Sequence, residues 1–460
     1  MGSIAGLPPG APAPQVAKPL STFERFQWNL YFLLAFDALF LIAVLGAGYV
    51  HREALQTIGR NSAPSIIAAQ HIKSAVAAID ANAADELLVK PMEGAAFRTN
   101  YVRARDEAGE GLIAAAENIT YGDSERIPID HLETGLGDYE SAVQRAIDLH
   151  DRNDPAAIDA YQVAARIADD KLLPAADSLD DANLNVMERA YAVAKSRDSI
   201  VRLAAMVAGF LLLAALIYVQ GLISERTRRT LNLPLVVATL AAFLYMAFAY
   251  RALTTEANSL KIAKEDAFRS IHLLWQARAN AYVARAHLSR YLLGGAEAEA
   301  DSKAFLDAAG RVAALPVGET FDQVASQATD NRRVENFTGY LAEELRNITF
   351  YGELDAAQET LRTWGQTATM YGNVLALERT GQKAQAIKLC TGLDSTNSGA
   401  FRRFDSSLGQ TLDINQHAFD DAVNRGFAAL SFFELTAFIA ATLIAALCVL
   451  GVWQRLREYL

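Results

Sequence analysis

The sequence predicts an all-α membrane protein with four transmembrane helices and two extracytoplasmic up-down four-helix bundles that are related by internal duplication. Three observations predict this fold. Four apolar stretches are long enough to cross a bilayer, the segments between them have helical patterns, and short matching motifs recur in the same order in both halves. The composition agrees, because 52% of the residues are hydrophobic and the mean hydropathy is +0.10, which is more apolar than soluble chains usually are.

A helix needs about 20 residues to cross the hydrocarbon core of a membrane. The stretches of sufficient length are 28–50, 201–223, 231–250 and 429–453. Aromatic side chains favour the membrane interface, and those near the ends of the stretches are Trp28, Tyr31, Tyr49, Tyr250 and Trp453. The first stretch is too long for a cleaved signal peptide and contains Asp37, so we expect a retained anchor.

Basic residues in short loops predict the orientation, because such loops tend to stay in the cytoplasm. They occur in the tail 1–27 (Lys18, Arg25), the loop 224–230 (Arg226, Arg228, Arg229) and the tail 454–460 (Arg455, Arg457). We therefore expect a multi-pass protein of the cytoplasmic membrane with both termini inside. The long segments 51–200 and 251–428 then lie outside, and the Pro-rich tail 1–27 is expected to be disordered.

Matching motifs divide the chain into two copies of span, outer segment and span. Asn29-Leu30 recurs as Asn232-Leu233, Glu53-Ala54 as Glu256-Ala257, Leu87-Leu88 as Leu292-Leu293, and Asn118-Ile119-Thr120 as Asn347-Ile348-Thr349. Self-similarity in fixed order is typical of duplicated units. The offset grows in the second copy, and the Gly- and Ala-rich segment 294–318 is the expected insertion.

Each outer segment has the pattern of a helical bundle. The run 235–293 contains no Gly or Pro, and residues at a seven-residue spacing predict one packing seam: Leu253, Leu260, Ala267, Leu274, Ala281 and Leu288. The run 175–208 is likewise expected to enter the second span as one helix. Turn signals near 91–94, 121–128 and 151–155, and near 294–318, 351–355 and 380–382, predict four helices in each segment. Pro64 and Pro174 are expected to kink outer helices.

The sequence contains no motif of catalysis, cofactor binding or metal binding. The seven histidines form no i, i+4 pair, and there is no Gly-rich phosphate loop after a strand and no Gly-x-Ser-x-Gly turn. Cys390 and Cys448 are not expected to pair, because the second lies in the last apolar stretch. The net charge of −11, with no basic cluster outside the short membrane-flanking loops, argues against nucleic acid. We therefore expect neither an enzyme nor a cofactor.

Three residues are candidates for signal coupling: Asp37, Glu434 and Pro174. Asp37 lies within the first span. A carboxylate within a span usually faces a partner or a cavity, so Asp37 is a candidate for helix pairing or signal coupling. A structural hydrogen bond to a neighbouring span is the plainer interpretation, and an ion path is the third.

Two arginine pairs are candidate contacts for a ligand carboxylate, because guanidinium groups bind carboxylates bidentately. They are Arg332 with Arg333 and Arg402 with Arg403. The alternative is a solvated charged surface.

Two spans that bracket a four-helix outer bundle resemble the sensor half of methyl-accepting chemotaxis receptors and related histidine kinases. The short segments 224–230 and 454–460 leave no room for the output domain of those families. The tracts 117–122 and 172–177 are also similar to segments of the actinobacterial four-span membrane protein that accompanies a glutamate/aspartate-binding lipoprotein and protein kinase G. That resemblance implies an outer surface for a solute-binding protein and an inner face that informs a kinase.

The sequence thus favours a transmembrane sensor whose partners are membrane lipid, an extracytoplasmic solute-binding protein or small ligand, and a separate cytoplasmic signalling partner. The sequence is also compatible with a homo-oligomer. The alternative is a structural scaffold of a cell-envelope complex, and a small transporter or channel is the third hypothesis.

Overall fold

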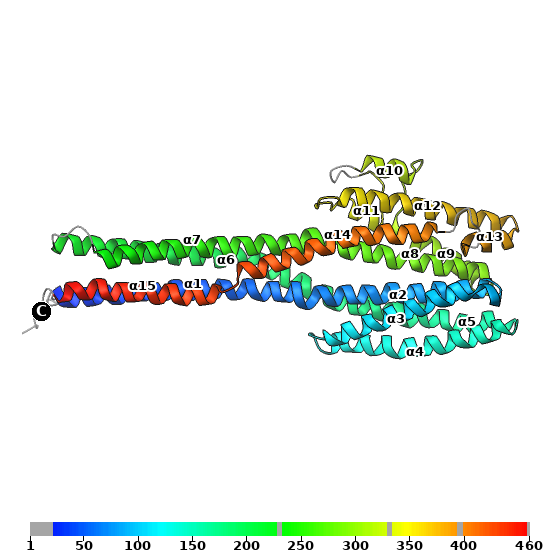
Figure 1. Cartoon of the computed structure of the whole chain (residues 1–460), viewed down its shortest axis with the longest axis horizontal. Helices are drawn as coiled ribbons and strands as arrows, with labels where there is room; N and C mark the ends of the chain where they lie inside the picture. Colours follow the sequence, from blue (N-terminus) through cyan, green and yellow to red (C-terminus); the bar gives the residue numbers. More distant parts are fainter. Residues whose placement is uncertain (1–21, 228–231, 329–333, 393–398, 458–460) are drawn as a thin grey trace, which may run out of the picture. The chain divides into compact units, whose positions relative to one another are not determined.

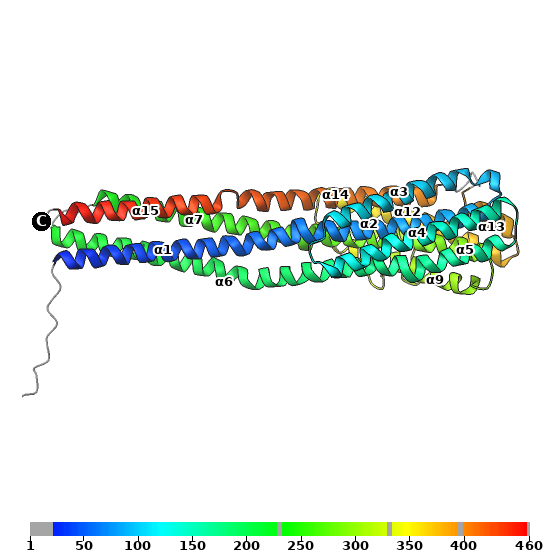
Figure 2. The same ribbon diagram turned by 90° about the horizontal axis from the view of Figure 1, so that it is seen from below.

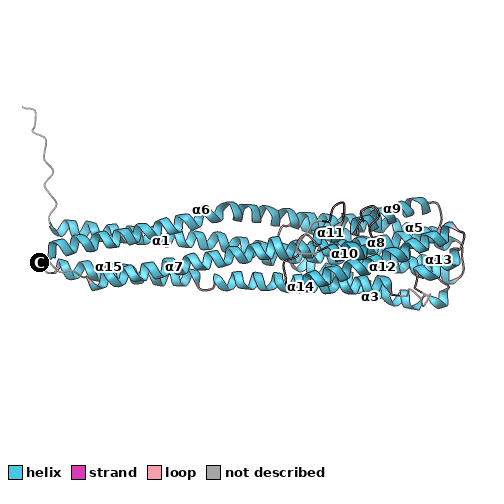
Figure 3. Ribbon diagram, turned by 90° about the horizontal axis from the view of Figure 1, so that it is seen from above, coloured by secondary structure: helices cyan, strands magenta, loops and turns pink. Residues whose placement is uncertain are grey.

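The structure is a computed structural model that describes residues 22–227, 232–328, 334–392 and 399–457. Within these ranges the chain is helical except for turns and one isolated bridge between Ala314 and Thr338 (Figure 3). The predicted all-α class is therefore confirmed. The chain divides into two compact units: Met1–Gly48 with Ser199–Ala252 and Phe432–Leu460, and Tyr49–Asp198 with Leu253–Ser431.

The first unit, called the apolar unit here, contains the parts of four helices that are long and apolar enough to cross a membrane. They belong to α1 (Thr22–Gln56), α6 (Leu173–Thr227), α7 (Leu233–Lys261) and α15 (Phe433–Leu456). Large apolar side chains on all four are exposed, as expected of lipid-facing surfaces: Ile42, Phe210, Leu244 and Ile439. The four predicted spans are thus confirmed as four apolar helices, and their membrane orientation stays a prediction.

The predicted start of the fourth span differs from the structure. Helix α14 (Ala400–Ala429) ends where the span was expected to begin, and residues 430–432 form a turn before α15. Phe432 has a φ of 58° in this turn, a left-handed conformation that bulky residues rarely adopt. Because the turn itself consists of Leu, Ser and Phe, hydropathy alone could not locate the break.

Close helix packing in the apolar unit depends on glycine. A Cβ added at Gly48 would lie 2.8 Å from the Phe433 ring, and one at Gly451 would lie 2.9 Å from Leu235 Cγ. Small residues allow membrane helices to approach closely. Asn232 adds a polar contact, because its Nδ2 donates to the Gly451 carbonyl at 2.8 Å.

The second unit, called the helical unit here, holds the two segments that were expected to form outer bundles. The first comprises η1 (Thr57–Ser62), α2 (Ala63–Leu88), η2 (Pro91–Glu93), α3 (Ala95–Glu117), α4 (Asp123–Asp151), α5 (Ala156–Ile167), η3 (Ala168–Leu172) and the start of α6. The second comprises η4 (Ile262–Phe268), α8 (Arg269–Leu293), α9 (Ala298–Val312), α10 (Phe321–Gln327), α11 (Tyr340–Glu344), α12 (Glu353–Arg379), α13 (Lys383–Cys390) and α14.

The helical unit has two hydrophobic clusters, one built by the first segment and one built mainly by the second, to which Leu55, Ile58, Ile66 and Met187 of the first segment also belong. The first core includes Ile72, Ile79, Leu132 and Tyr139, and the second includes Phe268, Trp364, Phe404 and Leu408. The six residues of the predicted heptad seam between Leu253 and Leu288 are all buried, which confirms that prediction.

Helices α2 and α8 join the two segments into one unit (Figure 1). Helix α2 is packed between α3 and α8, and its residues 74–87 are buried on every face. In Figure 2 the first segment's α3, α4 and α5 gather around α2. Because much of this stretch is alanine, neighbouring helices can approach α2 closely from several sides.

Most predicted turns lie where the structure has them, with two differences. Pro128 lies inside α4 rather than in the turn before it. The expected insertion 294–318 is largely helix α9, which packs on α8 as α3 packs on α2. The additional stretch of the second segment lies between α9 and α11, and its described residues are 313–328 and 334–339.

Candidate functional site

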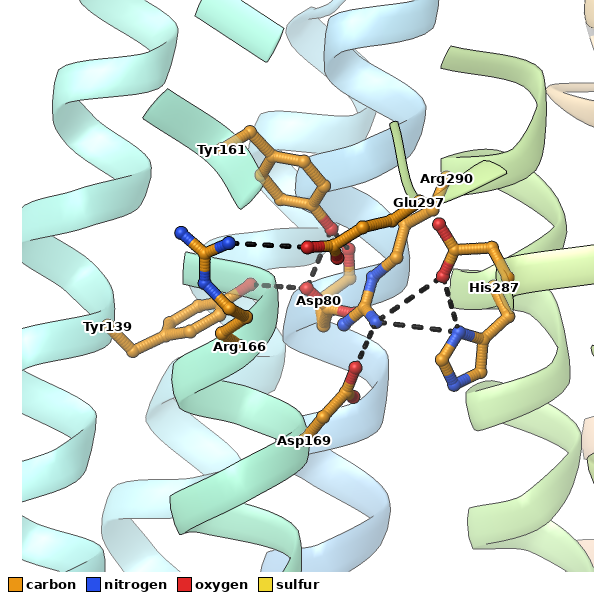
Figure 4. A network of polar contacts seen from close by, with 9 residues as sticks. Asp80, Tyr139, Tyr161, Arg166, Asp169, His287, Arg290 and Glu297 are labelled. Carbon is orange, nitrogen blue, oxygen red and sulfur yellow. Dashed lines mark hydrogen bonds and ion pairs between the residues drawn. The ribbon is translucent and has the colours of Figure 1, made fainter. Parts of the chain in front are cut away.

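A cluster of charged side chains, of which Asp80 and Arg290 are buried and Asp169 is partly exposed, joins helices α2, η3 and α8 (Figure 4). Arg290 of α8 forms an ion pair with Asp80 of α2, and the two side chains are only 5% and 3% exposed. Its Nη1 also donates to Asp169 Oδ2 of η3 at 2.6 Å. A buried ion pair requires both partners, because removal of either leaves an uncompensated charge.

Two buried tyrosines complete the surroundings of Asp80. Tyr161 of α5 donates to Asp80 Oδ1 at 2.7 Å, and Tyr139 of α4 donates to the same oxygen at 3.0 Å. Burial, together with the nearby Asp80 carboxylate, raises the pKa of both phenols well above the ordinary value. The tyrosines therefore remain donors, and Asp80 connects four elements: α2, α4, α5 and α8.

Arg290 stays charged in this site. Burial alone would lower its pKa, but the Asp80 carboxylate and the other acidic neighbours outweigh burial and raise the pKa well above the ordinary value. The network continues through His287, whose Nδ1 lies 2.8 Å from Asp301 Oδ1 of α9. At its exposed edge, Arg166 of α5 donates to Glu297 Oε1 at 3.2 Å.

A second buried ion pair lies one to two turns away. Asp85 of α2 is fully buried and pairs with Arg285 of α8, and Ser289 donates to its Oδ1 at 2.5 Å. Burial raises the pKa of Asp85, although Arg285 acts in the opposite direction. Helices α2 and α8 are therefore joined by two charge pairs in addition to their apolar contact.

Helix α6 also contacts the second segment through charged side chains. His272 Nε2 lies 3.0 Å from Asp180 Oδ2, and Lys264 Nζ lies 2.6 Å from Glu188 Oε1. Tyr191 donates to Glu265 at 2.8 Å. The two segments are thus connected along α6 as well as along α2.

The repeated Asn-Ile-Thr motif makes the same hydrogen bonds in both segments. Asn118 Nδ2 donates to the Asn61 carbonyl at 2.9 Å and to Ser65 Oγ at 2.7 Å. Asn347 Nδ2 donates to the Asp266 carbonyl at 2.7 Å and to Ser270 Oγ at 2.9 Å. Each asparagine therefore joins the loop to the end of a π-helical segment.

A glutamate after each motif holds the same loop. Glu125 Oε2 accepts the backbone N–H groups of Thr120 and Tyr121 at 2.7 and 2.6 Å. Glu353 Oε2 accepts those of Thr349 and Phe350 at 2.7 and 2.9 Å. In each segment the loop is thus bound from both sides, by the asparagine of the motif and by the glutamate that follows it.

The π-helical segments η1, η3 and η4 interrupt the long helices of the helical unit. Such segments are rare and often occur at functional sites. Pro64 follows η1 and Pro174 follows η3 within two residues. The altered hydrogen-bond spacing of a π-turn accommodates a proline that cannot donate, and the kinks expected at Pro64 and Pro174 stay a prediction.

The structure does not gather the predicted site residues in one place. Asp37 is buried within the apolar unit, and Glu434 is partly buried in the first turn of α15. Pro174 is the second residue of α6. Arg332 and Arg333 lie outside the described residues. Arg402 and Arg403 are exposed in the first turn of α14, where Arg403 Nε donates to Gln366 Oε1 at 3.1 Å.

The sequence analysis missed the buried charge cluster. A signal was present, because Asp80 and Asp85 interrupt a run of alanine and other apolar residues, and acids that are buried in such a run need a cationic partner. Within the described residues no group of three His, Cys, Asp or Glu side chains could hold a metal. The cluster is suited to fixing helix positions.

Comparison with known families matches part of the chain. Residues 54–192 match the model of the actinobacterial sensor domain, a range that covers η1 to the first part of α6 and includes Asp80, Asp85 and Asp169. No curated protein and no solved structure shows significant similarity to the chain. The family match and the four apolar helices together support a sensor role in a multi-pass membrane protein.

Proposed function

We propose that this chain is a transmembrane sensor that detects a small ligand, or a ligand-loaded solute-binding protein, outside the cell and relays the signal to a separate cytoplasmic partner such as a kinase. The match of residues 54–192 to the actinobacterial sensor domain carries this proposal. In it, the segments 51–200 and 251–428 lie outside and are duplicated copies of one unit. The identical hydrogen bonds of Asn118 and Asn347 support the duplication.

The relay rests on helix continuity. Helix α6 runs without a break from Leu173 to Thr227 and includes the predicted span 201–223. Packed helices move by about 1–2 Å in signalling transitions. A ligand that displaces η3 acts on Arg290 through Asp169, so both segments respond to one event.

Proline substitution tests the relay, because proline breaks the hydrogen bonding of a helix interior. Ala194→Pro interrupts α6, and Ala281→Pro interrupts α8. Ala298→Pro is the matched control, because Ala298 is the first residue of α9, where proline is tolerated. The readout is the phosphorylation of cytoplasmic proteins in cells that carry each variant, compared with wild-type and deletion strains.

We expect Ala194→Pro and Ala281→Pro to reproduce the phosphorylation pattern of the deletion strain while the protein still inserts, and Ala298→Pro to match wild type. The relay is wrong if deletion of the chain changes no cytoplasmic phosphorylation. The dense charge contacts between α2, α6 and α8 favour a second candidate, a structural scaffold. A scaffold predicts a stoichiometric complex that forms regardless of ligand.

A further inference from the structure

The second segment carries a stretch that has no counterpart in the first. Helix α3 runs uninterrupted from Ala95 to Glu117, whereas residues 313–339 separate α9 from α11. Backbone hydrogen bonds between Ala314 and Thr338, of 2.8 and 3.1 Å, close this stretch at its base. Inside it, α10 begins with a capping box formed by Thr320 and Gln323. The described parts of the stretch, residues 313–328 and 334–339, are therefore fixed by hydrogen bonds at the base and by the cap of α10.

Helix α12 is shaped to receive this stretch. A Cβ added at Gly365 would lie 2.6 Å from Phe321 Cβ, so only glycine permits the close approach. Val324 and Ala325 of α10 are fully buried. Gln358 of α12 donates to the Ala328 carbonyl at 2.7 Å, which fixes the far end of α10.

A groove of about 670 Å³ lies between this stretch and helices α12 and α14. Its volume is in the range of small-molecule sites, which combine apolar walls with a few polar groups. Leu315, Phe321 and Met370 are among its apolar lining residues. Most of the lining residues are polar or charged, so the groove fits a small charged ligand that also carries apolar groups.

The charges of the groove are divided between its sides. The additional stretch contributes Glu319 and Asp322, and the helices contribute Arg362 and Arg403. Among the described residues, neither arginine forms an ion pair with either of these acids; Arg362 lies 3.7 Å from Glu359, and Arg403 donates to Gln366. A guanidinium has five N–H donors, so both arginines retain donors for a ligand.

We propose that this groove binds a short zwitterionic peptide of two or three residues, with its carboxylate on Arg362 and Arg403 and its ammonium group on Glu319 and Asp322. The peptide side chains then contact Leu315, Phe321 and Met370. A peptide of two or three residues has one charge at each end, so it can contact the acids of residues 319–322 and the arginines of α12 and α14 at once. The inference rests on the proposed function, for which it supplies the ligand class.

Calorimetric titration of the full chain in lipid nanodiscs tests the site with three probes: Leu-Leu, Ala-Phe and Gly-Met, each with free ends. We expect saturable binding of at least one dipeptide. Arg403→Met and Glu319→Gln should each weaken it at least about tenfold, because each removes a charged hydrogen-bond partner. Acetylation of the peptide's amino group should weaken binding in wild type and have little further effect in Glu319→Gln.

Arg402→Met is the matched control, because Arg402 is the exposed neighbour of Arg403 and does not line the groove. Glu335→Gln is the control for Glu319→Gln, because Glu335 is exposed and does not line the groove. Unchanged melting temperatures show that the variants fold. No binding of any dipeptide, equal weakening by Arg402→Met, or tighter binding of free leucine than of Leu-Leu would overturn the proposal. Peptide binding without any change in cytoplasmic phosphorylation would leave the site in place and overturn only the relay.

Discussion

Arg290 and Asp80 stand 210 residues apart in the sequence, yet they form an ion pair in which both side chains are almost fully buried. The pair joins α8 of the second segment to α2 within the range that matches the sensor domain. It therefore connects residues inside the matched range to a helix outside that range.

Arg290→Met should lower the free energy of unfolding by about 3–5 kcal/mol, because it leaves the Asp80 carboxylate buried without its cation. Arg166→Met is the control, since Arg166 and Glu297 are 54% and 45% exposed and such a pair contributes about 0–1 kcal/mol. Chemical unfolding of the full chain in detergent micelles measures both. The double variant Asp80→Asn with Arg290→Met should recover part of the loss, and equal losses in the two arginine variants would contradict a special role for the buried pair.

Asn118→Ala and Asn347→Ala should each cost about 1–3 kcal/mol, because each removes two hydrogen bonds from a partly buried site. The two losses should be similar, since the partners are equivalent. Thr120→Ala, an exposed change in the same motif, should cost less than about 0.5 kcal/mol. Hydrogen exchange should become faster in residues 57–66 of Asn118→Ala and in residues 262–271 of Asn347→Ala. A change spread evenly over the helical unit would contradict the idea that each asparagine stabilises only its own π-helical segment.

Glu344 gives the helical unit a pH-dependent stability. Its position corresponds to Ala115 of the first segment, since each lies three residues before the asparagine of the repeated motif. Burial, followed by the charge of Glu353, raises the pKa of Glu344 from 4.5 to about 8, while Arg269 acts weakly in the opposite direction. The folded protein thus holds a proton that the unfolded chain releases above pH 4.5.

The contribution of this proton to the free energy of unfolding is fully present below about pH 4.5. It falls as the pH rises and is lost above about pH 8. Relative to Glu344→Gln, the wild type should lose up to about 1.4 kcal/mol per pH unit in that window. Melting temperatures of both proteins from pH 5 to about 9 test this. Glu343→Gln, at the more exposed neighbouring residue, should keep the wild-type slope. If the melting temperatures of wild type and Glu344→Gln changed in parallel with pH, Glu344 would be ionised over the whole pH range of the experiment.

Single cysteines test the predicted orientation in a chain whose native Cys390 and Cys448 are buried. Asp130→Cys and Tyr351→Cys place thiols on exposed residues of the two segments, and Glu225→Cys places one near the predicted inner loop. A membrane-impermeant maleimide should label the first two in intact spheroplasts and the third only after lysis. The reverse pattern would invert the topology and with it the direction of sensing.

The sequence was sufficient for the features that depend on local pattern. Four apolar runs located the four apolar helices, and the spacing from Leu253 to Leu288 identified a seam that is buried throughout. The pairing of α2 with α8 could not be read in this way, because Asp80 and Arg290 lie far apart and no local pattern assigns one to the other. The continuous burial of residues 74–87 nevertheless has a compositional sign, since a helix that is apolar on all faces belongs in an interior.

Only part of the groove could be predicted from the sequence. Arg403 was expected to meet a ligand, and it lines the groove, but its neighbour Arg402 does not. The contact between Gly365 and Phe321 could not be predicted, because it depends on how residues 313–328 pack on α12. Ligand binding by Arg403 stays a prediction, as do the roles of Asp37, Glu434 and Pro174.

The π-turn at Thr57–Ser62 has a consequence for how this chain tolerates deletions. A one-residue deletion in a regular α-helix rotates everything beyond it by about 100°. A π-turn already holds one surplus residue, so a deletion within 57–62 would produce an ordinary α-helix and leave the buried faces of α2 directed as before. Evolution could therefore shorten this helix here, whereas the same loss inside residues 74–87 would turn Asp85 away from Arg285.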